Sequence, residues 1–183
     1  VGPLVSWGTW LPLHALLLGG IGSAITLWSA HFADTLLPRP ALGGAALLDA
    51  RLYAHSLGTA VVLTGLTMGQ QAVALIGAGI VMAQASAGVV AITVQYRRAI
   101  APRLASLALH YAVALVLLAT GALLGFLISW SNAHGRSALA DGFYLAHTTT
   151  MLLGFVGTTV LGTLTVLWPT MLRTPMEPVA PRW

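Results

Sequence analysis

The sequence predicts an all-α, polytopic membrane protein, a bundle of five transmembrane helices. Of its 183 residues, 57% are hydrophobic and only 7% are charged, whereas a soluble domain carries roughly 25% charged residues. The mean hydropathy is +0.87. Apolar runs recur along the chain at about the 20 residues that a helix needs to cross a bilayer. We therefore expect a single transmembrane domain over residues 1–183.

The spans are expected at about 10–32, 51–68, 73–96, 104–130 and 143–168. The first ends before Asp34 and the proline-rich break that follows it, and the second opens near Arg51. A pair of glutamines, Gln70 and Gln71, separates the second span from the third. Arginines and a proline separate the third from the fourth, and a polar loop over 131–141 separates the fourth from the fifth.

Five crossings sort the arginines onto two sides of the membrane. Arg136 stands alone on one side, and the other seven share the opposite side: Arg39, Arg51, Arg97, Arg98, Arg103, Arg173 and Arg182. Because positively charged loops stay in the cytoplasm, this predicts an N-terminus outside and a cytoplasmic C-terminus. The absence of lysine and the abundance of alanine suggest a high-GC bacterial genome. We expect a multi-pass protein of the bacterial cytoplasmic membrane.

Composition also excludes several classes of function. The net charge of +4 is spread over loop arginines that face a lipid surface, which argues against a nucleic-acid partner. The chain has no cysteine, so thiolate-bound heme, cysteine-bound iron–sulfur clusters and disulfides are excluded. No Asp or Glu lies in the middle of a predicted span, which argues against a proton pump built on a carboxylate.

The histidines are the candidate functional residues. Ionisable side chains are costly inside a bilayer, and they mark functional sites there. His14 and His147 each lie four residues inside a span, about 6 Å below the predicted outer edge at 1.5 Å per residue. His55 and His110 lie about 6–10 Å from the predicted inner edge by the same rise. The sequence therefore predicts one histidine pair near each membrane face.

Paired imidazoles on facing helices are the ligands of a b-type heme. We expect heme b between His14 and His147 and between His55 and His110, with His31 and His134 as less favoured metal ligands. An alternative is a copper-binding or copper-relay subunit without heme, in which the Met151 thioether would add a soft ligand for Cu(I). A third alternative is a redox-silent scaffold whose histidines only join helices. The sequence identifies no catalytic residue.

Several segments also resemble a known family. They are Leu13 to Gly20, Trp28 to Ala33, His147 to Leu164 and Trp168 to Thr174. They resemble the membrane region of actinobacterial copper oxidase and copper nitrite reductase fusion proteins, and more distantly the heme-copper oxidase and nitric-oxide-response membrane family. The resemblance covers the first and last spans well and the middle three poorly. Relatives often read His-x-His where this chain has His147 and Thr149, so one ligand of a binuclear centre is missing.

The resemblance implies that His14 and His147 are heme or copper ligands. Relatives have more helices, often followed by a cupredoxin domain, which implies that this chain is a fragment, a split half or one subunit of a larger assembly. Taken together, we expect an electron-transfer protein or a subunit of a membrane oxidoreductase. Its expected partners are the lipid bilayer, a partner subunit or a second copy of the chain, and a quinone or a copper protein at the outer face.

Overall fold

The computed structural model describes residues 7–99 and 105–174, and every regular element in these ranges is a helix. The first long helix consists of α1 (Trp7–His14), the π-helical segment η2 (Ala15–Ile21) and α2 (Gly22–Leu36), which follow one another without a break. Then come α3 (Gly44–Thr67), α4 (Gln71–Arg98) and α5 (Ala105–Ala133). The last long helix consists of α6 (Ser137–Thr149), the π-helical segment η3 (Thr150–Gly157) and α7 (Thr158–Met171).

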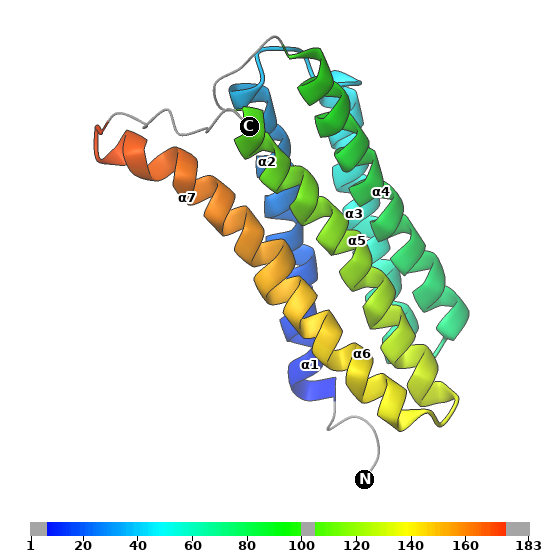
Figure 1. Ribbon diagram of the computed structural model, residues 1–183. Coiled ribbons are helices and arrows are strands. Elements are labelled where there is room, and N and C mark those ends of the chain that lie inside the picture. The colour runs from blue at the N-terminus through cyan, green and yellow to red at the C-terminus, as the bar shows by residue number, and fades with distance from the viewer. Residues whose placement is uncertain (1–6, 100–104, 175–183) are drawn as a thin grey trace.

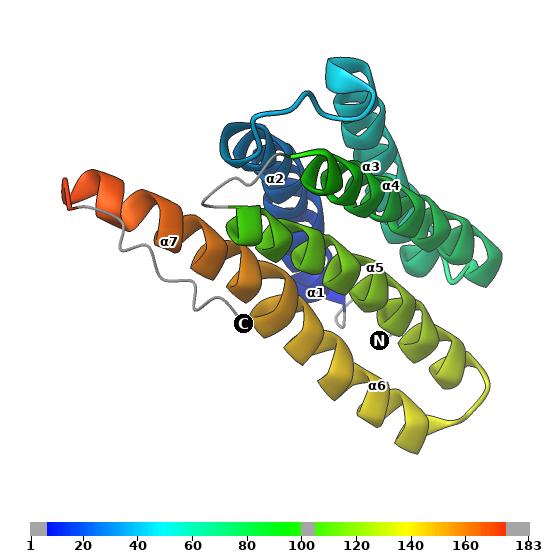
Figure 2. The ribbon, with the colours of Figure 1, turned by 45° about the horizontal axis from the view of Figure 1, so that its top comes forward.

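The helices form an up-and-down bundle in which α5 is central (Figure 1). It packs against α4 on one side, against α6, η3 and α7 on another, and against α2. Its buried side chains, such as Tyr111, Leu115 and Leu118, form the core together with Phe155 of η3 and Val81 of α4. Towards its C-terminal end α7 diverges from the other helices (Figures 1 and 2).

In the described part of the chain, four helices are long and apolar enough to cross a membrane: Gly8–Leu36, Gln71–Arg98, Ala105–Ala133 and Ser137–Met171. This confirms the all-helical class, and the length and apolar composition of the helices suggest a membrane protein, as expected. Their outer faces are rich in large apolar side chains, including Leu145, Leu153 and Leu161. Such a surface is stable against lipid tails, whereas in water it would associate with other apolar surfaces.

The fifth helix, α3, begins earlier than the sequence predicts. It starts at Gly44 rather than near Arg51, after Gly43 turns the chain with a φ of +71°. The hydropathy pattern places a boundary at Arg51 because a charge normally stays out of lipid. In the structure Arg51 lies within the helix and is covered by its neighbours, with 4% of its surface exposed.

The connection between the fourth and fifth predicted spans is shorter than expected. Residues 131–141 were expected to form a polar loop, but α5 continues to Ala133 and α6 already begins at Ser137. The described arginines still separate by the ends of the bundle. Arg136 lies at the α5–α6 turn, and those at the opposite end are Arg39, Arg51, Arg97, Arg98 and Arg173. Arg103 and Arg182 lie outside the described residues.

Candidate functional site: two facing histidines

His14 is the last residue of α1 and directly precedes the π-helical segment η2. Its Nδ1 lies 2.9 Å from the backbone carbonyl oxygen of Trp10, one helical turn earlier. The Trp10 indole stacks on the imidazole with ring centroids 4.4 Å apart. A carbonyl only accepts hydrogen bonds, so Nδ1 carries the proton and donates it. The lone pair of Nε2 is therefore free to bind a metal.

His147 is held in the same way, but by a neighbouring helix. It lies in α6, and its Nδ1 donates to the backbone carbonyl oxygen of Gly121 on α5 at 2.9 Å. One turn further along α5, Gly125 leaves room for the ring, because a Cβ there would lie 3.2 Å from Cε1 of His147. The Nε2 of His147 thus also keeps a free lone pair. Fixing one ring nitrogen on a carbonyl is how proteins orient a metal-binding imidazole.

The two imidazoles face each other across a gap between helices. Their ring centroids are 6.4 Å apart and their planes differ by 13°. Yet α1 packs mainly against η2 and α3, and α6 packs against α5 and η3, so their backbones make no extensive contact with each other. The contact between the His14 and His147 rings therefore joins the first long helix to the last.

A π-helical segment follows each of the two histidines. Such segments are rare, and they occur frequently at functional sites. Here η2 begins one residue after His14, and η3 begins three residues after His147. Both contain a Leu-Leu-Gly sequence, ending at Gly19 and Gly154. The two histidine-bearing helices thus share a backbone irregularity as well as a sequence pattern.

His55 has both ring nitrogens bonded to protein groups. It is fully buried, and its Nε2 donates to the backbone carbonyl of Leu18 in η2 at 2.8 Å. Its Nδ1 accepts from the Gln84 side-chain amide of α4 at 2.9 Å. Gly22 makes room for the ring, since a Cβ there would lie 2.7 Å from Nε2. In this arrangement neither nitrogen of His55 has a lone pair to offer a metal.

His110 faces a different helix. Its side chain packs against Gly162 of α7, where a Cβ would lie 2.9 Å from that of His110, and its Nδ1 has no hydrogen-bond partner. Within residues 7–99 and 105–174, no ring contact joins it to His55. The structure thus brings together the two histidines predicted near the outer face. It directs His55 and His110 towards different neighbours.

The buried bonds of His55 lead to a first testable prediction. In His55→Leu the Leu18 carbonyl and the Gln84 amide lose their partner without access to water, and an unsatisfied buried polar group costs about 1–3 kcal/mol. We expect the free energy of unfolding, measured by circular dichroism in mixed detergent micelles, to fall by about that amount. His31→Leu is the matched control, because His31 is exposed, and it should change stability little. Equal stability of the two variants would contradict the role of His55.

The two remaining histidines are exposed. His31 contacts Trp28 edge to face, with ring centroids 5.3 Å apart. His134 repeats the local geometry of His14: its Nδ1 donates to the Trp130 carbonyl at 2.8 Å, and the two rings are 4.4 Å apart. Among the described residues, however, no second histidine contacts the ring of His134. The Trp-x-x-x-His arrangement therefore orients a histidine but does not by itself make a pair.

The residues that hold the pair were not predicted from the sequence. Neither Trp10 nor the glycines of α5 entered the prediction of the pair. The sequence features that could have identified these residues are the four-residue spacing of Trp10 and His14 and that of Gly121 and Gly125. Over the described ranges no three His, Asp or Glu side chains gather as a metal site. The histidine pair thus offers two protein ligands, which suits heme iron better than a tetrahedral zinc ion.

Comparison of the chain with known protein families, with curated proteins and with solved structures finds no match. The function of the chain is therefore inferred from the geometry of the site. The resemblance to copper oxidase and nitrite reductase membrane regions stays a prediction from the sequence.

Proposed function

We propose that the protein is an integral membrane electron-transfer protein, or a subunit of a membrane oxidoreductase, that binds one b-type heme between His14 and His147. The observation that supports it is the pair of near-parallel imidazoles, 6.4 Å apart, on helices that do not pack on each other. Two imidazoles on opposite sides of one metal ion have centroids about 6 Å apart, given metal–nitrogen bonds of about 2 Å. The observed spacing of 6.4 Å is close to this value. Because each Nε2 lone pair lies in the plane of its ring, metal binding requires both rings to turn an edge towards the metal.

The surroundings of the pair also suit a flat, mostly apolar group. Backbone carbonyls accept a hydrogen bond from each Nδ1, so both rings are oriented without a charged neighbour in the lipid. Gly19 and Gly154 lie further along the two helices, where a Cβ would meet Thr59 and Leu117 rather than either imidazole. Bound heme would supply a one-electron couple. His14 and His147 would hold the heme, and the rest of the site would keep it within apolar surroundings.

The proposal also includes the topology. With α3 (Gly44–Thr67) as a fifth crossing, the positive-inside rule supports an outer N-terminus and a cytoplasmic C-terminus. The histidine pair then lies towards the outer face of a bacterial cytoplasmic membrane. That position suits electron exchange with a quinone or with a copper protein at this face. The inner pair, His55 and His110, does not enter the proposal.

Copper binding without heme is the second candidate. Two facing imidazoles also fit a two-coordinate Cu(I) ion, and a thioether is a ligand that Cu(I) favours. Met151 lies one turn after His147 and packs its sulfur against Gly121, the residue whose carbonyl holds the His147 ring. The Met151 sulfur and the His147 ring thus pack against the same face of α5.

The visible spectrum and the metal content of the purified full chain test both candidates. We expect a reduced-minus-oxidised spectrum with the α band of a b-type heme and about one heme per chain. Copper without heme would replace the first candidate with the second. Neither cofactor, in protein from cells supplied with both, would overturn both candidates and leave a scaffold role for the histidines.

A further inference from the structure

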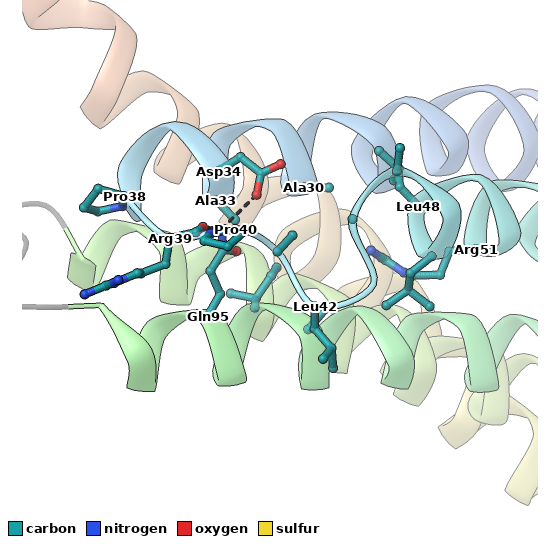
Figure 3. Close-up of a pocket in the computed structure, with 16 residues that line it drawn as sticks. Ala30, Ala33, Asp34, Pro38, Arg39, Pro40, Leu42, Leu48, Arg51 and Gln95 are labelled. Atoms are coloured by element: carbon teal, nitrogen blue, oxygen red, sulfur yellow. Dashed lines mark hydrogen bonds between the residues drawn. The ribbon is translucent and has the colours of Figure 1, made fainter.

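A pocket of about 600 Å³ opens at the end of the bundle opposite to the histidine pair. Its walls come from the last turns of α2, the loop over 37–43, the first turns of α3 and the last turns of α4 (Figure 3). Most of the lining is apolar, with alanines and leucines such as Leu48. The polar side chains are few: Asp34, Arg39, Arg51 and Gln95.

Arg51 is the buried cation of this pocket. Only 4% of its surface is exposed, and its Nε donates to the backbone carbonyl of Gln84 at 3.1 Å. Its Nη2 has no hydrogen-bond partner, and no carboxylate in the described part of the chain pairs with it. A buried charge without a counter-charge is strongly destabilising, since it loses its hydration and gains nothing in return. An anionic partner would therefore stabilise the buried guanidinium of Arg51.

The other polar groups of the pocket are already bonded or point elsewhere. The Gln95 amide donates both to Oδ1 of Asp34 at 2.8 Å and to the backbone carbonyl of Arg39 at 2.7 Å, which fixes the loop on α4. The Arg39 guanidinium extends away from Arg51, at the far side of the pocket (Figure 3). The two arginines outnumber the single carboxylate, so the pocket carries a net positive charge.

We propose that this pocket binds the phosphate group of an anionic phospholipid, with Arg51 as its principal donor. Phosphate oxygens form strong charge-assisted hydrogen bonds with guanidinium groups. The pocket lies at the end of apolar helices, where lipid headgroups lie, and its apolar walls suit the glycerol and the first acyl carbons. Basic pockets between membrane helices are a known way to bind anionic headgroups. The proposal does not depend on heme or copper at the histidine pair.

The test is native mass spectrometry of the full chain in detergent, titrated with phosphatidylglycerol, phosphatidylcholine or inorganic phosphate. We expect phosphatidylglycerol to bind at least about tenfold more tightly than phosphatidylcholine, and Arg51→Gln to remove about that factor, as expected for a lost charge-assisted hydrogen bond. Arg97→Gln is the matched control, because Arg97 is an exposed arginine of α4 that does not line the pocket. The Arg97→Gln variant should bind phosphatidylglycerol as tightly as the unaltered chain does.

A second variant keeps the test informative if Arg51→Gln does not fold. Ala45 lines the pocket and is exposed, so Ala45→Phe should fill the space, retain Arg51 and weaken phosphatidylglycerol binding by about tenfold as well. Inorganic phosphate that binds as tightly as the lipid would assign the site to free phosphate and overturn the lipid. Equal phosphatidylglycerol affinity of the unaltered chain and Ala45→Phe, or of the unaltered chain and folded Arg51→Gln, would overturn the site.

Discussion

Replacing either His14 or His147 with alanine is expected to abolish the α band of the reduced protein. In the proposed site His14 and His147 would each supply one of the two imidazoles that hold the heme, so the loss of either one would release the heme to detergent or make it high-spin. The single variants should therefore lose as much of the low-spin heme signal as the double variant. This non-additive result is expected when two groups act as one unit. Difference spectra of purified protein, normalised to protein content, measure it.

His134→Ala is the control for this pair of substitutions. Like His14, His134 has a tryptophan ring 4.4 Å away and donates to the backbone carbonyl of that tryptophan, four residues earlier. It differs in having no facing imidazole, so its loss should leave the spectrum unchanged. Full heme content in both His14→Ala and His147→Ala would remove the assignment. A loss caused by misfolding would show in the far-ultraviolet circular dichroism, whereas ligand loss would not.

The pairing of His14 with His147 could be predicted because depth in a helix follows directly from residue number. A constant rise of 1.5 Å per residue places His14 and His147 at similar levels once the span ends are known. Depth does not specify the direction in which a ring points, however, since that depends on how each helix is rotated against its neighbours. His55 and His110 were matched by depth alone. In the structure His55 turns to η2 and α4, while His110 turns to α7.

The fold could be predicted where lipid imposes the pattern, and not where packing overrides it. Long apolar runs predict helices because an unpaired backbone amide cannot be tolerated in lipid. The early start of α3 was not predicted because a charged residue normally marks the end of a span, whereas Arg51 is buried inside this helix. Gly88 of α4 makes that burial possible, since any Cβ there would collide with the guanidinium. The π-helical segments η2 and η3 were also missed. Their wider backbone turn has no clear signature in composition, although the repeated Leu-Leu-Gly marks where they lie.

The largest effect on stability is expected where α3 and α4 pack most closely. At Gly77 of α4, a Cβ would meet the backbone nitrogen of Val62 and lie 2.9 Å from the carbonyl oxygen of Gly58, both on α3. Backbone atoms cannot swing aside as a flexible side chain can, so the two helices must separate to admit even one methyl group. We expect Gly77→Ala to lower the free energy of unfolding by about 2–3 kcal/mol, the upper part of the usual overpacking range.

Gly79 provides a control only two residues away on the same helix. No atom lies within 4 Å of a Cβ placed there, so Gly79→Ala should be neutral or stabilise the helix by up to about 1 kcal/mol. Unfolding of both variants in mixed micelles, followed by circular dichroism, gives the comparison. If Gly77→Ala were as stable as Gly79→Ala, the close approach of α3 to α4 would be wrong. The burial of Arg51 and His55 between these helices would then be in question, because both depend on that approach.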